Sequence, residues 1–91
     1  MNIIKKDGRL EEFSISKIKR SILNASQEAL EPLTDSDLKV IESEIMNILK
    51  IINREKTSSY EIFAIILNVL KTLEFNNVGK AYLNSSISFY R

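Results

Sequence analysis

Three lysines near the start of the chain are the residues whose spacing points most directly to chemistry. Lys5 and Lys6 directly precede Asp7-Gly8, and Lys17 follows further along. Asp-Gly between two extended segments favours a tight hairpin, because glycine tolerates the positive φ that such turns need. A hairpin here, followed by a helix that begins near Lys17, would bring the three ammonium groups to one mouth. Such a mouth would suit a polyphosphate.

Each lysine also has a simpler interpretation. Lysines on an edge strand discourage pairing between sheets of different molecules, which alone would explain Lys5 and Lys6. Lys17 in the first turn of a helix opposes the helix dipole, and a bound anion would offset that small cost. The free backbone donors of the helix N-terminus would strengthen such binding. The residues alone therefore leave a surface role and a binding role open.

The same segment resembles the beginning of the ATP-cone family. ATP-cones are small nucleotide-sensing domains at the front of many ribonucleotide reductases and inside the repressor of their genes. The resemblance covers nearly the whole chain and implies one ATP-cone-like domain over residues 1–91. It rests on Lys5-Lys6-Asp7-Gly8-Arg9, Glu11, Phe13 and Ser16-Lys17-Ile18, and it continues weakly in Ser59, Ile62, Ala81-Tyr82 and Phe89-Tyr90-Arg91.

The resemblance implies a site for ATP or dATP. Mg²⁺ would accompany the triphosphate, since it usually bridges phosphates. In the family the matching basic pair reaches the phosphates, and the matching acid and capping residue help to hold the adenine or its surroundings. The implied nucleotide-binding residues are Ile3, Lys5, Lys6, Glu11, Ser14, Lys17, Ser59 and Arg91.

Four of these positions also have structural interpretations. Ile3 would form an apolar wall for the base or pack in the core, and the two roles are compatible. Glu11 would be a solvated strand residue, and Ser59 would cap a helix. Arg91 would close the phosphate end of the site or fray as the last residue.

One position departs from the family. Aligning Ile62 with the family's apolar position places Phe63 where some reductases have a histidine near the sugar and phosphates. Phenylalanine cannot form a hydrogen bond with a ribose hydroxyl. In the other possible alignment, Glu61 takes the position of that histidine and would repel phosphate unless a cation intervened. The choice between ATP and dATP therefore stays open.

The composition excludes several kinds of chemistry. The 91 residues include no cysteine and no histidine, which excludes disulfides, thiol catalysis, Cys-based zinc sites and histidine general bases. The balance of 13 basic and 12 acidic residues argues against a broad nucleic-acid surface. No apolar run reaches the roughly 18 residues that a membrane span needs, and no signal peptide is evident. We expect a cytoplasmic location and no membrane partner.

Capping residues and proline predict where the first helices begin and end. Ser14 caps a helix over roughly residues 15–30, and Pro32 ends it because proline cannot continue a helix. Thr34 begins a second helix. Its apolar stripe is Leu38, Ile41, Ile45, Ile48 and Ile52.

The second half of the chain predicts a central helix. The segment 53–56 holds a short third strand or a loop. Ser58 and Glu61 have the spacing of a capping box, and the next helix is apolar on almost every side, as central helices are. Asn76-Asn77 breaks the chain before a last helix. The expected fold class is α+β, mostly helical, with an N-terminal β-hairpin lid on a four-helix core.

The expected function is regulatory and not catalytic. Binding of ATP or dATP would shift the lid and adjoining helix surfaces between two arrangements, which a reductase or another regulated domain would sense. The alternative is an interaction module of the same fold that has lost nucleotide binding, as Phe63 and the small hydroxyl of Ser14 suggest. A DNA-binding domain fits the balanced charge least. Phe89 and Tyr90 at the chain end favour a symmetric dimer built on the last or second helix.

Overall fold

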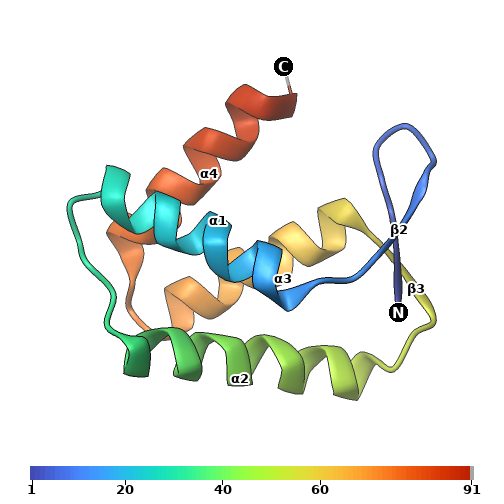
Figure 1. Ribbon diagram of the computed structural model, residues 1–91, viewed down its shortest axis with the longest axis horizontal. Helices are drawn as coiled ribbons and strands as arrows, with labels where there is room; N and C mark the ends of the chain where they lie inside the picture. Colours follow the sequence, from blue (N-terminus) through green and yellow to red (C-terminus); the bar gives the residue numbers. More distant parts are fainter. Residues whose placement is uncertain (91) are drawn as a thin grey trace.

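A small sheet lies at one end of the molecule, and the helices extend away from it (Figure 1). The computed structural model describes the backbone of residues 1–90 and the side chains of residues 1–85. The arrangement of helices and strands confirms the mostly helical α+β class and the N-terminal hairpin. The elements are β1 (Asn2–Ile4), β2 (Leu10–Glu12), α1 (Ile15–Glu28), α2 (Asp35–Ile52), β3 (Lys56–Ser58), α3 (Ser59–Thr72) and α4 (Asn76–Tyr90).

The hairpin forms where Asp7-Gly8 predicts it. Lys5 N donates to Arg9 O at 2.8 Å, and Gly8 N donates to Lys5 O at 2.9 Å, so Lys6, Asp7 and Gly8 form the loop. Gly8 has a φ of 87°, a conformation that glycine adopts without steric cost. The loop therefore places Lys6 at the tip of the hairpin and Lys5 directly after β1.

A third strand completes the sheet, and it begins at Lys56, the last residue of the segment in which a strand or a loop was expected. β1 is the middle strand, antiparallel to β2 and parallel to β3. Asn53 ends α2 in the left-handed conformation, with a φ of 48°. The two residues after it cross to the sheet, where Asn2 N donates to Glu55 O at 2.9 Å. Pairing with β1 therefore begins at Lys56.

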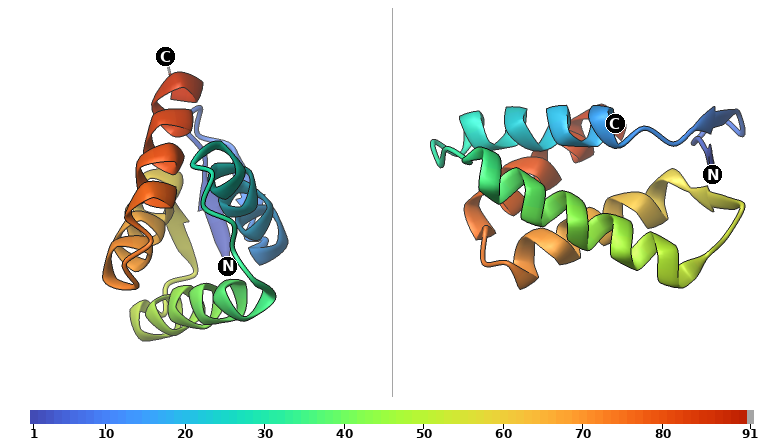
Figure 2. Two further views of the ribbon diagram at one scale, coloured as in Figure 1. Left: turned by 90° about the vertical axis from the view of Figure 1, so that its left-hand side faces the viewer. Right: turned by 60° about the horizontal axis from the view of Figure 1, so that its bottom comes forward.

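The core lies between the helices and the inner face of the sheet. α1 and α3 both pack against α4, and α2 packs against α3 (Figure 2). β1 contributes Ile3, whose side chain is buried. None of the described helices is long and apolar enough to cross a membrane. The largest fully buried side chains are Ile22, Ile41, Ile45, Ile66, Leu70 and Val78.

Two helix boundaries differ from the sequence-based expectation. α1 ends at Glu28, and the break before α4 lies ahead of Asn76-Asn77, which are the first residues of α4. In both breaks the residue directly after the helix cap has the left-handed conformation, Leu30 with a φ of 54° and Glu74 with a φ of 65°. Left-handed helix ends usually carry glycine or asparagine. The sequence has neither at these positions, so it gave no local signal for the two ends.

Candidate functional site

A pocket of about 220 Å³ lies where the hairpin meets the N-terminal ends of α1 and α3. Figure 1 shows that both helices begin beside the hairpin. Six of the eight residues expected to bind nucleotide line this pocket. They are Ile3, Lys5, Glu11, Ser14, Lys17 and Ser59. Their role in binding stays a prediction.

The strand register explains why the hairpin residues face the helices. Ile3 stands opposite Glu11 on β2 and opposite Thr57 on β3. Side chains paired across strands lie on the same face of a sheet, and the face alternates along a strand. Ile3, Glu11 and Thr57 therefore share the inner face, and Lys5 follows Ile3 at the interval of two residues that returns to it. Because of this alternation, Ile3, Lys5 and Glu11 reach one pocket.

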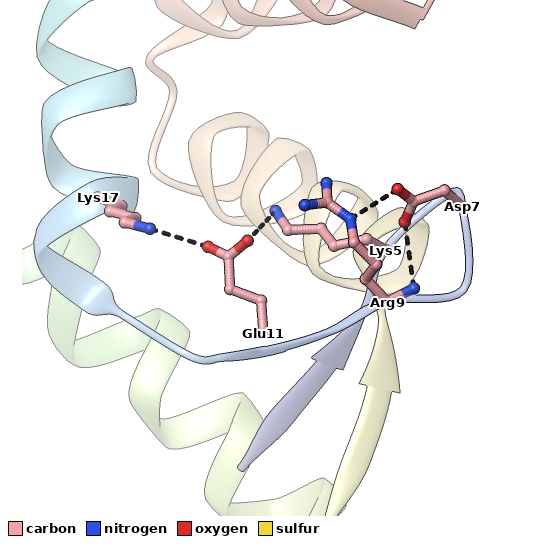
Figure 3. A network of polar contacts seen from close by, with 5 residues as sticks. All are labelled: Lys5, Asp7, Arg9, Glu11 and Lys17. Atoms are coloured by element: carbon pink, nitrogen blue, oxygen red, sulfur yellow. Dashed lines mark hydrogen bonds and ion pairs between the residues drawn. The ribbon is translucent and has the colours of Figure 1, made fainter.

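Lys5 and Lys17 converge on the carboxylate of Glu11 (Figure 3). Lys17 Nζ donates to Glu11 Oε1 at 2.9 Å, and Lys5 Nζ lies 3.5 Å from Glu11 Oε2. The hydrogen bond from Lys17, followed by the positive charge of Lys5, lowers the pKa of Glu11 below its ordinary value. The site thus contains a charged triad of Lys5, Glu11 and Lys17 from three segments of the chain.

Of the two remaining expected residues, Lys6 is described by the structure and Arg91 is not. Lys6 is exposed at the hairpin tip and does not line the pocket, so the expected convergence of three lysines is reduced to two. The tip is held locally, because Asp7 accepts hydrogen bonds from Arg9 N at 3.1 Å and Arg9 Nε at 2.6 Å. Arg91 lies outside the described residues, as do the side chains of Phe89 and Tyr90.

The two serine hydroxyls of the pocket have different roles. Ser14 Oγ accepts from Lys17 N at 3.5 Å and caps α1. α3 is capped by Ser58, whose Oγ accepts from Glu61 N at 3.1 Å. Ser59 Oγ is buried and, among the described residues, has no hydrogen-bond partner. An unsatisfied buried polar group costs about 1–3 kcal/mol, which makes this hydroxyl a natural contact for a ligand.

Phe63 lines the pocket, whereas the Glu61 carboxylate is bonded outside it. Arg54 Nη1 donates to both Glu61 oxygens at 2.9 and 2.7 Å, and Thr57 Oγ1 donates at 2.7 Å. Only the Ser58 half of the expected capping box is therefore made, because the Glu61 carboxylate is engaged by these two residues. Glu61 is not among the residues that line the pocket, whereas Phe63 is.

Tyr82 is a pocket residue that the sequence reasoning did not select. Its ring stacks with Phe63, with centroids 5.6 Å apart and an interplanar angle of 21°, and both residues line the pocket. Tyr82 comes from α4, far along the chain from the hairpin. The available signal was its place in the Ala81-Tyr82 part of the family resemblance.

A second hollow is larger and more open but holds none of the expected site residues. It has a volume of about 1130 Å³ and lies between the C-terminal half of α2 and the N-terminal segment. Its charged groups are mixed in sign: Glu44, Lys50, Arg54 and Glu55. Arg54 is already paired with Glu61 at 2.7 Å. The smaller pocket therefore has the more specific arrangement of cations and hydroxyls.

Comparison with known proteins agrees with this geometry. The family model described as the ATP cone domain matches residues 1–86, which include every described residue that lines the smaller pocket. A search of curated proteins found no match. ATP-cone domains are typically allosteric, nucleotide-sensing regulatory domains. Because the match spans nearly the whole sequence, this chain belongs to the ATP-cone family.

Proposed function

We propose that the chain binds an adenine nucleotide, ATP or dATP, in the pocket between the hairpin, α1 and α3, and that binding regulates a partner domain. The observation that carries the proposal is the convergence of Lys5, Lys17 and the buried hydroxyl of Ser59 on one pocket in an ATP-cone chain. The partner would be a ribonucleotide reductase domain or another regulated protein. The role proposed is regulatory and not catalytic.

The pocket has an apolar part and a charged part, as a nucleotide requires. Ile3 and Ile62 are buried, and the stacked rings of Phe63 and Tyr82 add apolar surface. These groups suit a base, because ligand pockets combine apolar walls with a few polar anchors. The Lys17 side chain is 72% exposed. Phosphates bound there would remain open to solvent, where Mg²⁺ could bridge them and keep its waters.

The size of the pocket supports a lid that moves. Pockets for drug-sized ligands usually have volumes of about 300–1,000 Å³, and this pocket has about 220 Å³. A nucleotide would therefore have to displace part of the lining. The hairpin is the element best able to move, since its strands have three residues each and short hairpins are marginally stable by themselves. A ligand that favours the displaced hairpin would shift the population toward it.

Calorimetric titration with ATP, dATP and GTP tests the proposal. We expect ATP or dATP to bind and GTP to bind more weakly. Lys17→Met should weaken binding by roughly 1.5–3 kcal/mol, which is the range for a hydrogen bond to a charged group. Lys39→Met is the matched control, because Lys39 is exposed on α2 and does not line the pocket. Absence of heat with millimolar ATP and dATP, in a protein that melts cooperatively, would contradict the proposal.

The second candidate function is that of an interaction module without a nucleotide. It is favoured by Glu11, which already forms ion pairs with both pocket lysines, and by Phe63, which cannot form a hydrogen bond with a ribose hydroxyl. The same titration separates the two functions. An interaction module would give no heat with any of the three nucleotides and no thermal shift.

A further inference from the structure

We propose that Glu11 is a built-in competitor for phosphate: its carboxylate occupies the place between Lys5 and Lys17 that a polyphosphate would take, and it leaves when the phosphates bind. This inference rests on the proposed function, because it requires a pocket that accepts polyphosphate. It adds to that function a contact that keeps the empty site closed.

The geometry of the triad carries the inference. Each Glu11 oxygen faces a different ammonium group, Oε1 that of Lys17 at 2.9 Å and Oε2 that of Lys5 at 3.5 Å (Figure 3). A phosphate group between the same two lysines would present its oxygens in the same manner. Two anions cannot occupy one place, so the carboxylate and a phosphate exclude each other.

The charge balance of the pocket leads to the same conclusion. Its charged lining residues within the described structure are Lys5, Lys17, Glu11 and Glu12, whose formal charges cancel. A polyphosphate therefore meets little net attraction while Glu11 remains in place. Once the carboxylate has moved away, both lysines are available, and their attraction for phosphate is no longer opposed at short range.

Glu11 also connects the elements that would have to separate. It belongs to β2, Lys5 follows β1, and Lys17 lies in the first turn of α1. The ion pair with Lys17 ties the hairpin to the N-terminus of α1. Phosphate binding that releases this pair would free β2 from α1, so the arrival of the ligand would loosen the lid.

Inorganic tripolyphosphate is the probe, because it has phosphates but no base or sugar. We expect Glu11→Gln to bind it about fivefold to tenfold more tightly than the wild type, since exposed ion pairs contribute modestly and two of them would no longer compete. Glu12→Gln is the matched control: it removes the same charge from the same pocket, but Glu12 forms no ion pair in the described structure. It should bind less than twofold more tightly, roughly the effect of a solvent-screened charge that forms an ion pair with neither lysine.

A double-mutant cycle shows whether the tighter tripolyphosphate binding of Glu11→Gln depends on Lys17. In a Lys17→Met background, Glu11→Gln should give a much smaller gain than in the wild type. In the wild type itself, tripolyphosphate should shift the side-chain carboxyl resonance of Glu11 in a ¹³C NMR titration. This measurement does not depend on the folding of any variant.

The outcomes separate the inference from the proposed function. Unchanged or weaker tripolyphosphate binding by Glu11→Gln, an equal gain for Glu12→Gln, or an unmoved Glu11 carboxyl resonance would overturn the inference. If ATP or dATP still bound the wild type, the proposed function would stand. If neither adenine nucleotide nor tripolyphosphate bound any of the proteins, both would fail together.

Discussion

Single residues in the pocket have chemical states that can be measured without a ligand. The pKa of Glu11 is lowered mainly by the hydrogen bond from Lys17 and next by the charge of Lys5. We predict that Lys17→Met raises the pKa of the Glu11 carboxyl toward its ordinary value, and by more than Lys5→Met does. NMR titration of the carboxyl carbon measures this. Equal pKa values for Glu11 in the wild type and Lys17→Met would show that the ion pair does not form in solution.

The lowered pKa of Glu11 also gives a stability that depends on pH. A carboxyl group with a lower pKa in the folded state stabilises the fold at pH values above its unfolded-state pKa, and the contribution disappears as pH falls through the folded-state pKa. We therefore predict that the free energy of unfolding falls less steeply for Glu11→Gln than for the wild type between about pH 6 and about pH 3. Urea unfolding at several pH values measures it. Parallel curves would contradict the prediction.

The adjacent residues Ser58 and Ser59 provide a matched pair of hydroxyl deletions. Ser58→Ala removes the cap of α3 and should cost about 1 kcal/mol of stability. Ser59→Ala removes a buried hydroxyl that has no partner in the described structure, so it should leave stability unchanged or raise it. The same change should weaken nucleotide binding by about 0.5–1.5 kcal/mol. Thermal melts and calorimetry distinguish the two variants, and a destabilised Ser59→Ala would contradict the assignment.

At the scale of elements, α1 ends with a leucine in a conformation that favours glycine. Leu30 has a φ of 54° and is 89% exposed. Glu31 N donates to Ser26 O, and Leu30 N donates to Gln27 O, which is the bonding of a Schellman helix end. The left-handed conformation costs a leucine roughly 1–2 kcal/mol. This cost is borne within the helix end, because so exposed a side chain gains little from packing.

We predict that Leu30→Gly stabilises the protein by about 0.5–1 kcal/mol, because the relieved strain exceeds the entropy that glycine loses on folding. Ala29→Gly is the control, since Ala29 has a right-handed φ of −75° and glycine has no advantage there. Urea unfolding should therefore show opposite changes in the free energy of unfolding for the two variants. A loss of stability in Leu30→Gly would mean that its side chain makes contacts in solution.

For the whole molecule, ligand binding and folding are linked. A nucleotide that binds only the folded chain, present at 100 times its dissociation constant, should stabilise the fold by about 2.7 kcal/mol. We predict that Lys17→Met reduces the thermal shift at a fixed ATP or dATP concentration, while Lys39→Met keeps it. Equal shifts for both variants would place the nucleotide elsewhere on the molecule.

Self-association is also a property of the whole molecule. The expected symmetric dimer on the last or second helix stays a prediction, and the side chains of Phe89 and Tyr90 lie outside the described residues. If the regulatory function is right, nucleotide should change the dimerisation constant, because a ligand shifts an equilibrium only through different affinities for its states. Sedimentation at several protein concentrations, with and without nucleotide, measures it. A monomer under all conditions would contradict the predicted dimer and would leave the proposed nucleotide binding unaffected.

The features that sequence alone determined are those encoded within a few neighbouring residues. Asp7-Gly8 specified the hairpin, because one glycine with positive φ closes its loop. Ser14 and Thr34 specified helix starts, because a cap bonds to a backbone group three residues away. The convergence of Lys5 and Lys17 followed from these same local elements. The sequence did not predict the helix ends beside Leu30 and Glu74, because no glycine marks them.

Tertiary structure alone decided which side chains from different elements contact one another. It placed Glu11 between Lys5 and Lys17, left Lys6 out of the pocket lining, and brought Tyr82 from α4 against Phe63. It also directed Glu61 to Arg54 and Thr57, away from the pocket, while Ser59 was left without a partner among the described residues. Each of these contacts depends on how packed segments meet and which charges compete, and no local pattern in the chain encodes that competition.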